Sequence, residues 1–393
     1  MPGIAAPMNE VRERDLRLDF CRGVALIVIF IDHVPGNPLS SWTLRNFSFC
    51  DAAEVFVLIS GMASYLAYGS RLGRFGFGAC AKAVGRSCIR IYLAHLLLIA
   101  VVAGVMLLIA RRYSGADYID SLKLQWLVED PWRAILAAIS LAYLPRLMDI
   151  LPLYILLLTI APALVVMVKR DYRVALLLSA TVYLLAWNFG WNLSADKHGR
   201  EWYLNPFTWQ LLYTIGMTLS HLSRTAPRTL PWDRRWLFLA LSFLTVTAVI
   251  AWPLNRLGVT QMAPFSYVWP ADKTYLSPLR IVNVLALLYV FAFFVSPRAP
   301  WLKKTLAGMC ISCGRHSLTV YGVGLLLSCI GYAVIQESGA PHIANLAVNI
   351  LGIGILFLTA GVLDRHANGR RAMPVSAIGV GNPVNAVASL RTS

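Results

Sequence analysis

The sequence predicts an all-α fold, a polytopic bundle of about ten transmembrane helices with both termini in the cytoplasm. Three observations support this prediction. The chain of 393 residues is 58% hydrophobic, with a mean hydropathy of +0.63. Only 14% of its residues are charged, against roughly 25% in soluble globular proteins. Lys and Arg outnumber Asp and Glu by 35 to 19. Together they exclude a soluble enzyme and a disordered chain, which needs low hydrophobicity.

About ten apolar segments reach the length of roughly 20 residues that a membrane span requires. They lie at residues 18–34, 49–69, 88–110, 150–168, 172–190, 206–222, 236–252, 278–296, 315–335 and 343–363. We read the first as a retained helix rather than a cleaved signal peptide, because it contains Asp32 and His33 and no small-residue cleavage site follows it. Segment 134–144 is too short to span, so we expect it to be interfacial or re-entrant.

The basic residues set the predicted orientation. With the N-terminus inside, about two thirds of Lys and Arg fall on the cytoplasmic side, and every inner loop is basic. A span at 134–144 would move the basic stretches 224–235 and 298–304 outside, so we reject that topology. The enrichment of Lys and Arg in cytoplasmic loops thus accounts for the net charge of +16. We therefore predict no nucleic-acid partner.

The predicted organisation has a short cytoplasmic segment at 1–17, a membrane domain at 18–363 and a flexible cytoplasmic tail at 364–393. The two substantial outer loops are 111–149 and 253–277, and the first is long enough to hold short helices.

Cysteine spacing gives little functional information. Cys310 and Cys313 have the C-x-x-C spacing of redox or zinc sites, but they face the cytoplasm in this topology and no second ligand pair accompanies them. We predict neither a metal site nor a disulfide.

Ionisable residues inside a span cost at least about 2.5–3.5 kcal/mol near the bilayer centre and mark functional sites by default. Arg22 enters the first span from the cytoplasmic side, and Asp32 and His33 lie near its outer end. A rise of 1.5 Å per residue separates Arg22 from His33 by about 16 Å. Because histidine accepts a proton near neutral pH, His33 is a candidate general base. The alternative is that Asp32 only reaches the interface and His33 makes a packed polar contact.

Two further groups lie at span ends. Asp51 and Glu54 share one face at the outer start of the second span, where helix capping alone would explain Asp51. Arg86 and Arg90 share one face at the inner start of the third span. Arginine binds phosphate bidentately, but ordinary positive-inside flanking also explains these two.

Weaker candidates are Asp149, which opens the fourth predicted span, and Arg280, which starts the eighth from outside. Trp and Tyr cluster at 187–209 and 252–275. Most of these aromatics are expected in the interfacial belt, and some could stack on sugar faces.

In this order, the motifs resemble the acyltransferase-3 superfamily of membrane enzymes. The resemblance rests on Arg22-Gly23 with His33, on Phe56-Val-Leu-Ile-Ser60-Gly61, on Arg86 with Arg90-Ile91-Tyr92, and on Gly314-Arg315-His316-Ser317-Leu318. The stretches 14–23, 44–54 and 149–154 are more closely similar to the OpgC branch, which attaches succinyl groups to osmoregulated periplasmic glucans. One departure is that the superfamily often has a later histidine, which the Tyr321-Gly-Val-Gly stretch lacks.

The resemblance implies a bacterial inner-membrane O-acyltransferase with acyl-CoA, most simply succinyl-CoA, as co-substrate and no permanently bound cofactor. Its partners would be acyl-CoA, a periplasmic glucan and membrane lipids, and no oligomeric state is specified. His33 would act as general base, with Asp32 or Glu54 fixing its tautomer. The remaining expected site residues are, on the acyl-CoA side, Arg22, Arg86, Arg90, Tyr92 and Arg315, and on the side of the acceptor or the acyl carboxylate, Arg45, Asp51, Asp149 and Arg280.

Two alternatives stay open. The same enzyme could transfer acetyl to another envelope polysaccharide. A secondary transporter would also bury charges, but its inverted repeats and paired broken helices are not seen in the sequence. Since no Ser or Cys stands beside His33 in sequence, we favour direct transfer over an acyl-enzyme.

Overall fold

The computed structural model describes residues 14–113, 116–229, 232–256 and 272–372. Over these ranges the chain forms helices and loops, with a single isolated β-bridge between Ser194 and Glu201. The first part of the chain holds α1 (Leu16–His33), η1 (Pro38–Trp42), α2 (Leu44–Phe47), α3 (Ala52–Arg112), α4 (Ala116–Ser121), α5 (Gln125–Glu129), α6 (Pro131–Ile139) and α7 (Ile150–Phe189). The second part holds α8 (Pro206–Thr225), η2 (Pro227–Thr229), α9 (Arg234–Arg256), α11 (Pro278–Phe294), η4 (Pro300–Lys303), α12 (Thr305–Arg315), α13 (Ser317–Glu337) and α14 (Pro341–Ala372).

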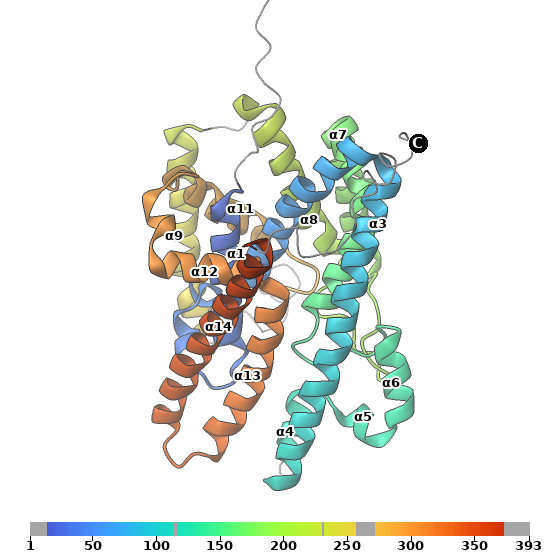
Figure 1. Ribbon diagram of the computed structural model, residues 1–393, viewed down its shortest axis with the longest axis vertical. Coiled ribbons are helices and arrows are strands. Elements are labelled where there is room, and N and C mark those ends of the chain that lie inside the picture. The colour runs from blue at the N-terminus through green and yellow to red at the C-terminus, as the bar shows by residue number, and fades with distance from the viewer. Residues whose placement is uncertain (1–13, 114–115, 230–231, 257–271, 373–393) are drawn as a thin grey trace, which may run out of the picture.

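Two of these helices are long and sharply bent. Helix α3, of 61 residues, leaves helical geometry at Gly76, whose φ is 76°. Helix α7, of 40 residues, does so at Asp171, whose carboxylate accepts a hydrogen bond from the N–H of Arg173 and caps the second arm. In Figure 1 the first arm of α3 rises to one end of the bundle and the second arm returns. The sequence prediction of separate segments at 49–69 and 88–110, and at 150–168 and 172–190, therefore corresponds to the arms of two bent helices.

Five helices in the described part of the chain are long and apolar enough to cross a membrane, namely α3, α7, α9, α13 and α14. Helix α11 is apolar but has 17 residues. The all-helical class is thus confirmed for the described residues, and these five apolar helices fit a membrane protein. The number of about ten spans and the cytoplasmic location of the chain ends stay predictions.

The loop predictions are tested at several points. The first part of segment 134–144 lies in α6, whose nine residues end at Ile139 and are too short to span, and the rest is loop. Helices α4 and α5 are short helices of the kind expected in loop 111–149. Helix α14 runs past residue 363, the predicted end of the last span, to Ala372. The rest of the predicted tail, residues 373–393, lies outside the described residues. So do residues 1–13 of the N-terminal segment and residues 257–271 of the second outer loop.

Helix α1 packs inside the bundle against α12, α13 and α3. Its crossing with α12 is a reciprocal glycine contact: a Cβ on Gly23 would lie 1.8 Å from the Cys310 carbonyl oxygen, and one on Gly314 would lie 1.9 Å from the Asp19 carbonyl oxygen. Small residues of this kind let helix backbones approach closely in membrane proteins. The close contact fixes the position of α1 in the bundle, and His33 is its last residue.

Helices α3 and α8 cross in the same way. A Cβ on Gly61 would lie 2.1 Å from the Tyr213 carbonyl oxygen, and one on Gly216 would lie 2.2 Å from the Leu58 carbonyl oxygen. This contact holds the first arm of α3, which begins beside the C-terminal end of α1.

Candidate functional site

A cavity of about 770 Å³ lies where α1 ends and α3 begins. We call it the His33 cavity. Its volume is typical of small-molecule sites. Its lining comes from α1, α2, α3, α7, α11, α13 and the loops between them, and comprises Ile29, Asp32, His33, Arg45, Asp51, Ala52, Ala53, Lys123, Arg146, Leu147, Asp149, Ile150, Arg200, Glu201, Trp202, Tyr203, Leu204, Lys273, Thr274, Arg280 and Tyr321.

The chain immediately after His33 holds this residue in place. Helix α1 ends here because Val34 precedes Pro35, which disfavours helical geometry at Val34 and cannot continue the helix. Asn37 then donates a hydrogen bond of 3.0 Å to the carbonyl of Ile31. Asn37 and Asn349 of α14 also exchange two amide hydrogen bonds of 2.9 Å. The C-terminal end of α1 is thereby tied to α14.

The His33 imidazole has an available nitrogen. Its Nδ1 is buried and has no hydrogen-bond partner among the described residues. The neighbouring Asp32 carboxylate accepts a hydrogen bond of 2.6 Å from the Thr43 hydroxyl. Within the described chain no hydrogen bond joins His33 to Asp32 or to Glu54, so the expected tautomer-fixing contact is not formed in this structure.

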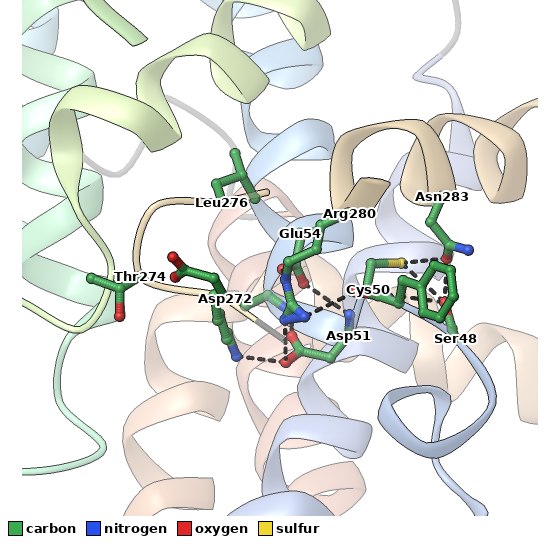
Figure 2. A network of polar contacts seen from close by, with 12 residues as sticks. Ser48, Cys50, Asp51, Glu54, Asp272, Thr274, Leu276, Arg280 and Asn283 are labelled. Carbon is green, nitrogen blue, oxygen red and sulfur yellow. Dashed lines mark hydrogen bonds and ion pairs between the residues drawn. The ribbon is translucent and has the colours of Figure 1, made fainter. Parts of the chain in front are cut away.

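Asp51 and Glu54 form a capping box, which supports the capping interpretation. Asp51 accepts from the N–H of Ala53 at 2.7 Å, and Glu54 accepts from the N–H of Asp51 at 2.8 Å. Both carboxylates also pair with cations from distant parts of the chain (Figure 2). Lys273 Nζ lies 2.5 Å from Asp51, and Arg280 Nε lies 2.7 Å from Glu54.

Glu54 is 0% exposed and is absent from the lining of the His33 cavity, so the structure does not bring it together with His33. Arg280 does line the cavity, but its guanidinium already binds groups of the protein. It contacts Glu54, lies 3.6 Å from Asp51 and donates to the Phe49 carbonyl at 2.8 Å. The two carboxylates, Asp51 and Glu54, are thus neutralised by the two cations, Lys273 and Arg280.

Lys273 was not singled out in the sequence, because its partner is distant along the chain. The loop that carries it is fixed by aromatic side chains of α7 and α8: Trp209 donates to the Lys273 carbonyl at 3.1 Å, and Trp187 donates to the Tyr275 carbonyl at 2.8 Å. Burial is the largest single effect and opposes the charged form of Lys273, but the charges of Asp51, Tyr203 and Glu54 together outweigh burial and raise the pKa of Lys273 above its ordinary range.

Asp149 also lines the His33 cavity. Its side chain is 6% exposed, and its Oδ1 has no hydrogen-bond partner among the described residues. Burial raises the pKa of Asp149 to about 6. Tyr321 lines the same cavity, and its hydroxyl donates to the Leu147 carbonyl at 2.9 Å.

A second cavity, about 300 Å³ in volume, lies between the two arms of α3. We call it the kink cavity. Its basic lining residues are Arg71, Arg86 and Arg90. None of the three has an ion-pair partner among the described residues. The structure therefore brings Arg86 and Arg90 together and adds Arg71, which was not among the expected site residues.

The other residues expected on the acyl-CoA side lie elsewhere. The Tyr92 hydroxyl donates to the Ile139 carbonyl of α6 at 2.7 Å. Arg315 pairs with Asp19 at 3.8 Å. Arg22 lies over the Phe56 ring at 6.0 Å. Their expected grouping with Arg86 and Arg90 is not observed, because each has a partner outside the kink cavity.

A protein-family model described as OpgC protein matches residues 14–368. No curated protein and no solved structure shows a match to the chain.

Proposed function

The chain belongs to the OpgC family, and from this premise we propose that it is an inner-membrane O-acyltransferase that moves a succinyl group from cytoplasmic succinyl-CoA to hydroxyls of periplasmic glucans. The observation that carries the proposal is the unpartnered, buried Nδ1 of His33 in a polar cavity of about 770 Å³. A transferase needs a positioned base beside its acceptor, and a cavity of this size admits a sugar unit together with an acyl group.

In the proposed reaction, His33 takes the proton from a glucan hydroxyl while the hydroxyl oxygen attacks the thioester carbonyl carbon. The C–S bond then breaks, and the imidazolium returns the proton to the leaving CoA sulfur. The step requires only the acyl donor and the acceptor, and it forms one ester for each thioester broken. Asp32, held by Thr43, stabilises the imidazolium through its charge rather than through a direct hydrogen bond.

The kink cavity supports the donor side of the proposal. Three arginines without carboxylate partners in the described chain suit the phosphates of CoA, since guanidinium binds phosphate bidentately. Arg90 lies 14 residues beyond Gly76, which is about 21 Å back along the second arm of α3. The basic side chains thus run from the bend of α3 towards the His33 cavity, and the pantetheine arm of CoA would extend in the same direction.

The direct test is mass analysis of periplasmic glucans from wild-type, deletion, His33→Ala and His342→Ala strains. His342 is exposed at the start of α14 and serves as the matched control. We expect succinylated glucans from the wild type and His342→Ala, and unmodified glucans from the deletion and His33→Ala at equal protein level.

Three results would contradict the proposal. Normal succinylation by His33→Ala would show that His33 is not the general base. Acetyl groups in place of succinyl groups would identify another cargo. Glucans retained in the cytoplasm of the deletion strain would indicate a transporter.

A further inference from the structure

The basic side chains that line the His33 cavity differ in how they are neutralised. Four of the six basic lining residues in the described chain have a carboxylate partner. These pairs are Lys123 with Asp120, Arg200 with Asp196, Lys273 with Asp51, and Arg280 with Glu54. Arg45 acts electrostatically on Asp32, its neighbour in the cavity.

Arg146 is different. It lies in the loop between α6 and α7, and its side chain is exposed and lines the cavity. Its guanidinium acts electrostatically on Asp120, whose carboxylate pairs with Lys123, but Arg146 itself makes no ion pair and no side-chain hydrogen bond within the described residues.

The backbone around Arg146 is well fixed. The N–H of Arg146 donates to the Leu122 carbonyl at 2.9 Å. Tyr321 of α13 donates to the Leu147 carbonyl at 2.9 Å, and Tyr143 donates to the Lys123 carbonyl at 2.8 Å. A cation with an anchored backbone and an unpaired guanidinium is suited to bind a ligand anion, because only its side chain and not its backbone has to be ordered on binding.

We propose that Arg146 is the specificity-determining residue that binds the free carboxylate of a dicarboxylic acyl group during transfer at His33. The inference rests on the proposed function and deepens it. Arginine meets a carboxylate through two parallel hydrogen bonds. Because a neutral acyl group of the same length offers no partner to this guanidinium, the enzyme selects the charged acyl group at this position. The sequence had indicated Arg45 or Arg280 for this role, but the Arg280 guanidinium is occupied by Glu54 and Phe49.

The test compares succinyl-CoA with butyryl-CoA, which has the same carbon chain with a methyl group in place of the carboxylate. The full-length protein is purified into lipid nanodiscs and supplied with unmodified glucan, and kcat/KM is measured for each donor. We expect Arg146→Gln to lower the ratio of succinyl to butyryl transfer by about 10- to 100-fold. Butyryl transfer should be unchanged, which also reports that the variant is folded.

The matched control is Arg133→Gln. Arg133 is an exposed arginine of α6 that pairs with Asp130 at 3.5 Å and does not line the cavity. It should leave the donor ratio at the wild-type value, and Arg146→Lys should recover part of the loss because it restores the charge without the planar fork.

The outcomes are distinguishable. An unchanged donor ratio in Arg146→Gln, or a ratio that falls in Arg45→Gln instead, would overturn the assignment while leaving the acyltransferase intact. A wild-type protein that transfers neither acyl group would contradict the proposed function itself.

Discussion

Nε of Arg280 lies 2.7 Å from Oε1 of Glu54, and both side chains are buried, at 9% and 0% exposure. Removing one partner of a buried ion pair leaves an uncompensated charge and typically costs about 3–5 kcal/mol. We therefore expect Glu54→Leu to lower the thermal midpoint of the purified protein strongly, with a loss of at least about 3 kcal/mol. Thermal unfolding in detergent measures the effect.

The control for this prediction is Asp130→Asn, which breaks an exposed pair with Arg133. Exposed pairs contribute at most about 1 kcal/mol, so this variant should unfold close to the wild type. Equal midpoints for both variants would show that the buried pair does not stabilise the bundle.

Part of this arrangement was visible in the sequence. The spacing of Asp51 and Glu54 placed both on one helical face, and the structure confirms the capping interpretation. The cations could not be assigned because Arg280 is 226 residues from Glu54 along the chain. Local periodicity carries no information about such a contact.

Other features were hidden for different reasons. The apolar helices α3, α7, α9, α13 and α14 coincide with predicted apolar segments, because hydropathy depends on composition alone. The bend at Gly76 depends on a positive φ at one glycine, and the tight approach of Gly23 to Gly314 depends on the tertiary packing. Arg146 and Arg71 could not be singled out from the sequence, because only the structure shows that they line the two cavities.

The glycine crossing of α1 with α12 gives a second prediction. In Gly23→Ala, the new Cβ would lie 1.8 Å from the Cys310 carbonyl oxygen, so the two helices must separate. Overpacking of this kind costs about 1–3 kcal/mol, and displacement of α1 should also shift His33 and reduce transfer. Thermal unfolding and glucan succinylation are measured together.

Gly308→Ala is the matched control within α12, because a Cβ there meets nothing within 4 Å. Its expected effect is neutral or stabilising by about 0.5–1 kcal/mol, since alanine favours a helix over glycine. If Gly23→Ala were as stable and active as Gly308→Ala, the helices would not be in the close contact described.

The kink cavity gives a third prediction, on donor binding. Arg71→Gln and Arg86→Gln each remove a candidate phosphate contact, and we expect KM for succinyl-CoA to rise about 10-fold in each, with little change in kcat. The reason is that the phosphates stay bound in the same way through the transition state. Initial rates over a range of succinyl-CoA concentrations provide both constants.

Arg74→Gln is the control for donor binding. Arg74 is exposed on α3 near the bend but does not line the kink cavity. An equal rise in KM for Arg74→Gln would indicate a general effect of positive charge. Unchanged KM values in all three variants would show that succinyl-CoA does not bind in the kink cavity.

Asp149 gives a prediction on pH and stability. Burial raises its pKa from the ordinary value of 3.8 to about 6, so the folded protein favours the neutral carboxyl. The stabilisation is fully present below about pH 4, where the group is neutral in both states, and it is lost as pH rises through about 6. Two pKa units correspond to about 3 kcal/mol. Since Asp149 makes no side-chain capping bond to α7, Asp149→Asn removes this dependence without removing a cap.

Midpoints of thermal unfolding between pH 2 and pH 8 test this prediction. The wild type should lose stability relative to Asp149→Asn as pH rises from 4 to 6, and the difference should level off above pH 7. Asp196→Asn is an internal comparison with the opposite sign. Burial would raise the pKa of Asp196, but hydrogen bonds from Arg200 lower it, so its stabilisation is lost as pH falls. Parallel curves for the wild type and Asp149→Asn would mean that Asp149 is charged at little cost in the His33 cavity, which requires a cation beside it in solution.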